Sequence, residues 1–239
     1  MDSAYFSRVS ADIQQLIRQA EAAMDVEIDV LVDDSIEHMQ CNVEHRRPRL
    51  ITPAEDHFPD GAVAHEMLHV QRFRVEGVPM VVDDPDHEAW SIDIGRGLLS
   101  LDNSLEHLII VPMELALRAD RRTRWEASMQ RVWSNGIAAL PLRNDQKRQA
   151  LINWCFLAHV LPDSPVIPVA EAELERLHIA VPAKQMRDEI GAAKHSKEEM
   201  VRICLRYFGL DPSIALFQYL DRRTGQRSTA PIYAHSTPQ

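Results

Sequence analysis

The sequence predicts an α+β fold, in which a small sheet packs on one helix of the N-terminal part and a mostly helical half follows. Three observations lead to this prediction. Apolar and polar residues alternate in 26–32, which is typical of a half-buried strand. Residues 10–24 and 61–75 carry apolar side chains at helical spacing. From residue 120 onward, helix start and stop signals follow one another.

Composition and charge narrow the class of protein. The 239 residues are 45% hydrophobic and 26% charged, which is enough for one large domain or two small ones around a core. The chain has no apolar run of membrane-spanning length and no export signal at its start, so we expect a cytoplasmic protein without a membrane partner. Its three widely spaced cysteines fit reduced thiols. The net charge of −10 argues against nucleic acid as the main partner.

Two short segments follow the first helix and strand. Residues 35–43 fit either a short helix or a loop. Pro48 and Pro53 bracket residues 49–52, which predicts an edge strand, because proline cannot donate to a ladder. Such an edge could hold an extended peptide by strand addition, or it could be an ordinary short strand without that role.

The helix predicted for residues 61–75 contains His65-Glu66-Met67-Leu68-His69. Residues four apart lie on one helix face, so His65 and His69 can offer ring nitrogens to one metal ion. Glu66 lies about 100° round the helix, where it would contact the metal-bound water. This spacing is a zinc-protease signature. The alternative is a structural helix that holds two histidines by chance.

Downstream of this helix, helical segments alternate with breaks. Glu76-Gly77 ends the helix, and the acidic segment 83–88 predicts a solvated turn rather than a second metal site. Asp102-Asn103-Ser104 begins a helix over 105–117, which Pro112 should bend or break. We further expect a short strand at 78–82, helices at 121–134, 144–160, 197–208 and 213–220, and a polar surface tail at 221–239.

A catalytic zinc site needs a third protein ligand. Glu76 lies about 10 Å along the helix from the second histidine, too far to share the metal. Arg72 and Val75 occupy the positions where an early-turning subclass has Gly and His. Glu106, at the start of the next helix, is the remaining good candidate. His107 points about 100° away and is the second choice as a ligand, or a second-sphere or oxyanion-stabilising group. The alternative to a role at the metal is that Glu106 and His107 are both solvated helix residues.

The order of elements resembles the gluzincin branch of the zincin metallopeptidases, and more narrowly its small ImmA/IrrE-type members. The resemblance covers residues 10–118 and rests on the helix, the strands, the His-Glu-x-x-His motif, and Glu106 followed by an apolar stretch into Pro112-Met113. It implies a zincin fold, zinc bound by His65, His69 and Glu106, and Glu66 as general base. Family members more often carry small residues where this chain has 107–109, which leaves subfamily and substrate open.

These features predict a zinc-dependent metallopeptidase that hydrolyses peptide bonds of a protein or peptide substrate. The predicted organisation is a metallopeptidase core at 1–118, a helical region at 119–220 and a tail at 221–239. One alternative is a non-catalytic regulator or interaction module that keeps the zincin scaffold. A weaker one is an all-helical structural protein in which the motif is accidental. Nothing in the sequence indicates an oligomeric state.

Overall fold

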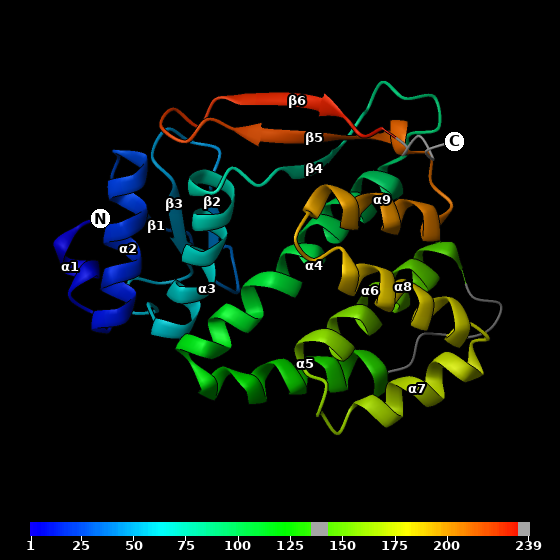
Figure 1. Cartoon of the computed structure of the whole chain (residues 1–239). Helices are drawn as coiled ribbons and strands as arrows, with labels where there is room; N and C mark the ends of the chain where they lie inside the picture. The colour runs from blue at the N-terminus through cyan, green and yellow to red at the C-terminus, as the bar shows by residue number, and fades with distance from the viewer. Residues whose placement is uncertain (135–142, 234–239) are drawn as a thin grey trace. The chain divides into compact units, whose positions relative to one another are not determined.

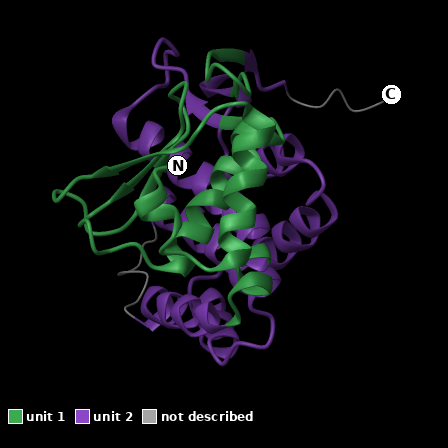
Figure 2. Cartoon of the chain, turned by 90° about the vertical axis from the view of Figure 1, so that its left-hand side faces the viewer, with its two compact units in different colours: residues 1–80, 113–119, 218–229 green, residues 81–112, 120–217, 230–239 purple. Residues whose placement is uncertain are grey.

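The computed structural model describes residues 1–134 and 143–233 and has a mixed α+β fold (Figure 1). Contacts divide the chain into two compact units, each built from separate stretches of sequence (Figure 2). Unit 1 holds residues 1–80, 113–119 and 218–229, and unit 2 holds 81–112, 120–217 and 230–239. The predicted organisation cuts the chain into continuous pieces, whereas both observed units are discontinuous.

The elements follow one another along the chain with these bounds. The first part contains α1 (Ser3–Phe6), α2 (Ala11–Met24), β1 (Asp29–Val32), β2 (Gln40–Asn42), β3 (Arg49–Thr52), α3 (Asp60–Val70) and the π-helix η1 (Gln71–Val75). The rest contains β4 (Met80–Asp83), α4 (Ile92–Leu117), η2 (Ala119–Arg121), α5 (Arg122–Ser134), α6 (Asn144–Val160), α7 (Ile167–Arg176), α8 (Ala180–Ala192), α9 (Lys197–Phe208), η3 (Pro212–Ile214), β5 (Ala215–Leu220) and β6 (Arg227–Pro231).

β3 is the central strand of the sheet in unit 1, whose strand order is β1-β3-β2. Its residue Leu50 pairs with β1 in the parallel direction and with Cys41 of β2 in the antiparallel direction. The prediction of an edge strand at 49–52 is therefore wrong. Pro48 and Pro53 stand just outside the paired residues, so they remove no donor from either ladder.

Helices α2 and α3 pack on each other and on this sheet (Figure 1). α2 buries Ile13, Ile17, Ala20 and Met24, the stripe that its sequence predicts. These side chains form one core with Leu50 of β3 and with the buried residues of α3. The edge strand β2 lies in the segment that fits either a helix or a loop, and it contacts α3. Unit 1 therefore holds the motif helix between a second helix and the sheet.

α4 is much longer than the predicted helix. It begins at Ile92 rather than near Asp102, and it continues through Pro112 to Leu117. Pro112 removes one intrahelical hydrogen bond, but Leu105, Leu108, Ile110 and Val111 beside it are all buried. Burial of this apolar stretch favours the helix more than the proline opposes it, so the expected break does not occur. The chain passes from unit 2 to unit 1 within this helix.

The last predicted helix, at 213–220, is wrong. Pro212–Ile214 form a single 3-10 turn, and Ala215–Leu220 form strand β5. Strand β5 lies between β4 and β6 in a second sheet, and most of its residues are buried. A helix of eight residues is marginal in water by itself, whereas pairing in the sheet is accompanied by burial of most of this segment. The predicted tail contains β6, and its last six residues, 234–239, lie outside the described part of the chain.

Several helix boundaries agree with their sequence signals. Ser196 caps the start of α9, where its Oγ accepts a hydrogen bond from the Glu199 amide at 3.2 Å, and Gly209 caps the end of this helix with φ +62°. α6 spans the predicted 144–160. The signal for the end of α5, Asn135-Gly136, lies outside the described residues. No helix in the described ranges combines the length and the apolar character that crossing a membrane requires.

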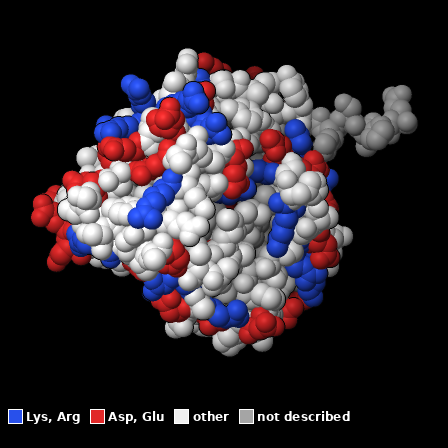
Figure 3. All heavy atoms as spheres, turned by 60° about the vertical axis from the view of Figure 1, so that its left-hand side comes forward, with Lys and Arg blue, Asp and Glu red and all other residues white. Residues whose placement is uncertain are grey.

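Charged side chains of both signs are mixed over the face of the molecule shown in Figure 3. The formal net charge of −10 arises from 36 acidic and 26 basic residues. On this face, the acidic excess is therefore spread among basic groups rather than gathered into one field.

Arg74 joins the end of the motif helix to two loops of unit 1. Its side chain is completely buried, and burial lowers its pKa although Asp221 opposes this effect. Gly225 packs against the same place: a Cβ added to it would lie 2.7 Å from the His45 carbonyl oxygen and 3.2 Å from the Arg74 guanidinium. The guanidinium donates to the backbone carbonyl oxygens of Val43 (2.8 Å), His45 (2.6 Å), Arg46 (3.3 Å) and Arg222 (2.8 Å).

Replacing Arg74 with Met should lower the free energy of unfolding by about 3 kcal/mol or more, because several buried carbonyl groups lose their donor. Urea denaturation followed by circular dichroism measures this loss. The matched control is Arg223→Met, which removes an exposed arginine from one of the loops that Arg74 contacts and should cost under about 1 kcal/mol. Equal effects of the two substitutions would contradict the role given to Arg74.

Candidate metal centre

Helix α3 presents His65 and His69 on one face. Their ring centroids are 5.1 Å apart and their planes meet at 81°. His69 is buried, and its ring stacks on Phe73 of η1 with a centroid distance of 5.8 Å. The π-helix that follows the motif belongs to a class of distortion frequent at functional sites. The two imidazoles thus pack on each other, and the His69 ring also packs on the π-helix that continues the motif helix.

Glu66 points from α3 toward strand β2. Cys41 of β2 lies close to its carboxylate. Burial raises the pKa of Glu66, and the charge of Glu114 raises it further, whereas His65 and both the thiol and the backbone amide of Cys41 lower this pKa. Burial, followed by the negative charge of Glu66, raises the pKa of the Cys41 thiol well above its ordinary value. Cys41 therefore acts as a neutral donor that fixes the direction of the Glu66 carboxylate.

Glu114 is the carboxylate that unit 1 places against the motif. It lies in the last two turns of α4, its side chain is completely buried, and its Oε2 lies 3.0 Å from Nδ1 of His65. When Nδ1 of the imidazole donates to this carboxylate, Nε2 is the nitrogen that can coordinate a metal ion. Carboxylates commonly orient metal-binding histidines in this way.

Arg118 and Asp60 connect the end of α4 to the start of α3. The guanidinium of Arg118 lies 2.7 Å from Oδ2 of Asp60, and Oδ1 of Asp60 accepts a hydrogen bond from the Ser10 amide at 3.1 Å. Asp60 also stands in the first turn of α3, where a negative charge is favourable. These contacts hold residues 113–119 beside the motif helix, and so they help to keep Glu114 at His65.

The predicted ligand Glu106 has another partner. It belongs to unit 2, where its carboxylate is completely buried and lies 2.9 Å from Nζ of Lys197. Asp102 lies 2.7 Å from the same ammonium group. A carboxylate that already neutralises a buried lysine is a weaker candidate for a metal ligand than an uncommitted one. Its assignment as the third ligand stays a prediction.

His107 also belongs to unit 2, and its ring lies edge-on to Trp125 with a centroid distance of 5.2 Å. Within the single helix α4, His107 and Glu114 are seven residues apart and share one face. Glu106 faces about 80° away from Glu114. The role of His107 as a ligand or as an oxyanion-stabilising group stays a prediction.

Two site residues, Glu114 and Cys41, were missed by sequence reasoning. Glu114, like Glu106, is a carboxylate in an apolar stretch, which is the pattern that marks Glu106 as a candidate ligand. That signal was hidden by the expected break at Pro112. Cys41 gave no signal, because its contact with Glu66 depends on which strand lies at the sheet edge. No protein-family model, curated protein or solved structure matches this chain.

Glu114→Gln should weaken zinc binding about 10- to 100-fold, because the amide orients the His65 ring less strongly than a carboxylate does. Competition with a chromogenic chelator measures the affinity. Glu76→Gln, an exposed carboxylate beyond the motif, serves as the control and should bind zinc like the wild type. Wild-type affinity in Glu114→Gln would show that the contact with His65 has no part in a metal site.

The buried pair of Asp102 and Lys197 predicts a dependence of stability on pH. Burial raises the pKa of Asp102 from 3.8, so the folded chain keeps this proton at pH values where the unfolded chain has lost it. Stability therefore falls as the pH rises through the window above 3.8. Lys197 opposes the rise in this pKa, so Lys197→Met should widen the window upward and cost about 3–5 kcal/mol near neutral pH.

Urea denaturation of Lys197→Met at pH 5 and pH 8 tests this prediction, with a larger loss expected at pH 8. Lys184→Met removes an exposed lysine of unit 2 and should change the stability little at either pH. The same loss at both pH values would mean that the carboxylates do not share a buried charge with Lys197.

Proposed function

We propose that the protein is a zinc-dependent metallopeptidase whose site is built on α3. The observation that carries the proposal is the surroundings of the His-Glu-x-x-His motif in unit 1. Both histidines lie on one helix face, a buried carboxylate contacts Nδ1 of His65, and Cys41 lies beside Glu66. A helix with two accidental histidines needs none of these partners.

His65 and His69 would hold the zinc through ring nitrogens, and Glu114 would orient His65. Imidazole nitrogens suit zinc, and a carboxylate that receives the second ring N–H raises the basicity of such a ligand. α4 offers Glu106 and His107 as the predicted third donor. The ion pair with Lys197 disfavours Glu106.

Glu66 would act as the general base and then as the acid. Zinc bound at this site would supply a water molecule of lowered pKa. The Glu66 carboxylate would take the proton of the attacking nucleophile and return it to the leaving amine. Its raised pKa suits both roles, because a proton acceptor works best when its pKa lies near the working pH.

Strand β2 offers a place for an extended peptide. It forms an edge of the sheet in unit 1, and its residue Cys41 contacts Glu66. A peptide added to an edge strand is held by main-chain hydrogen bonds. Such a peptide on β2 would run beside the general base. This supports a protein or peptide substrate, with β2 taking the role that the sequence suggested for residues 49–52.

Metal analysis combined with Glu66→Gln tests the proposed function. The purified wild type should hold one zinc per chain and cleave a peptide library. Glu66→Gln should keep the zinc and lose about 10²- to 10⁴-fold in cleavage rate, because only the proton transfer is removed. His65→Ala and His69→Ala should lose both zinc and cleavage.

Absence of stoichiometric zinc, or undiminished hydrolysis by Glu66→Gln, would reject the proposal. Tight zinc binding without cleavage of any peptide would instead support the non-catalytic scaffold. Glu76→Gln serves as the control for a carboxylate on the same helical segment and should cleave at the wild-type rate.

A further inference from the structure

Unit 2 contains a cavity of about 830 Å³ between the first turns of α4, the first half of α6 and the chain after α9. This volume falls within the range of small-molecule sites. All of its lining residues belong to unit 2. They include apolar side chains of all three segments, Gly97 and Arg96 of α4, and Arg143 and Arg148 at α6.

The floor of the cavity is apolar. Leu98, Leu101 and Ile152 are 1%, 3% and 3% exposed. The side chains of Phe208 and Leu210 add further apolar surface. An apolar floor of this kind favours a ligand with an aliphatic or aromatic body, because burying that body removes apolar surface from water.

Arg148 supplies a positive charge that no carboxylate of the described residues pairs with directly. It is partly buried, its Nε donates to the Phe208 carbonyl oxygen at 3.3 Å, and burial lowers its pKa although the charge of Asp145 opposes this effect. Within residues 1–134 and 143–233 it forms no ion pair. Arg143 differs, because Asp145 pairs with it at 2.9 Å and Asp93 adds a second negative charge nearby. A partly desolvated guanidinium without a carboxylate partner gains most from an anion.

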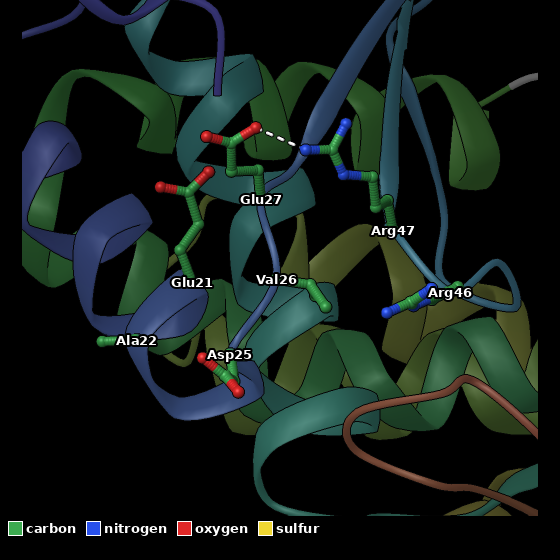
Figure 4. Close-up of a pocket in the computed structure, with 7 residues that line it drawn as sticks. All are labelled: Glu21, Ala22, Asp25, Val26, Glu27, Arg46 and Arg47. Atoms are coloured by element: carbon green, nitrogen blue, oxygen red, sulfur yellow. Dashed lines mark hydrogen bonds and ion pairs between the residues drawn. The ribbon is translucent and has the colours of Figure 1, made fainter.

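The cavity of unit 1 shows the opposite pattern (Figure 4). It measures about 580 Å³, and acidic and basic side chains line it together. Arg47 pairs with Glu27 at 2.5 Å and also with Asp29 at 3.2 Å. Glu21 accepts a hydrogen bond from the Ile28 amide at 2.9 Å. Arg47 is therefore already paired with carboxylates, and only Ala22 and Val26 add apolar side chains to the lining of this cavity.

We propose that the cavity of unit 2 binds an amphipathic organic anion, a carboxylate joined to an aliphatic or aromatic body. The carboxylate of the ligand accepts hydrogen bonds from the guanidinium of Arg148, and the exposed Arg96 adds a second positive charge at the rim. The body of the ligand covers Leu98, Leu101 and Ile152. Planar guanidinium groups match carboxylates by paired hydrogen bonds, which gives the site its preference for the headgroup.

Isothermal titration calorimetry with three probes tests this proposal. Decanoate carries both the headgroup and the body, whereas acetate carries only the headgroup and decan-1-ol only the body. Decanoate, used below its micelle concentration, should bind at least about tenfold more tightly than either control probe, because each of them loses one set of contacts.

Three variants locate the binding. Arg148→Met should weaken decanoate binding about 10- to 100-fold and leave the weak binding of decan-1-ol unchanged. An added Cβ at Gly97 meets no atom within 4 Å, so Gly97→Phe can fill the cavity without a clash at Cβ and should weaken both ligands. Lys147→Met removes a charge from the same helix but does not line the cavity, and it should bind decanoate like the wild type.

Two results would overturn the proposal. One is decanoate binding no tighter than decan-1-ol or acetate. The other is an equal loss of affinity in Lys147→Met and Arg148→Met. Because Gly97→Phe keeps every charge, wild-type decanoate binding in this variant would place the ligand outside the cavity even if Arg148→Met failed to fold.

Discussion

The cost of burying polar groups on a mostly buried helix determines what surrounds the motif of this protein. Seven of the eleven residues of α3 are buried, yet the helix carries two histidines and a glutamate. Polar groups in such a place require partners. Glu114 contacts His65, and Cys41 donates to Glu66. Satisfying these groups also orients them for the chemistry that we propose.

The same requirement explains why separate stretches of chain assemble unit 1. Glu114 comes from the end of α4, so that helix must continue past Pro112 and remain beside α3, where Arg118 and Asp60 tie the two together. Cys41 comes from the edge strand of the sheet. Arg74 then joins the end of the motif helix to the loops of unit 1. Each connection links the motif to a different part of the sequence.

Local signals predicted much of the fold and only part of the site. The stripe of Ile13 and Ile17 and the cap at Ser196 depend on near neighbours, and both were predicted correctly. Tertiary burial overrode the local signals in β5, where the expected helix was wrong, and at Pro112, where the helix continues instead of breaking. The roles of Glu114 and Cys41 depend on contacts between distant segments, which periodicity and capping signals do not report.

In the metal centre that we propose, the histidines of α3 bind zinc, and Cys41 only supports Glu66. X-ray absorption spectroscopy at the zinc edge of the purified protein tests it most directly. We expect one zinc per chain, with nitrogen and oxygen ligands at about 2.0–2.2 Å and an imidazole signature. A sulfur ligand at about 2.3 Å would contradict the role given to Cys41. A protein without bound zinc would contradict the metal centre itself.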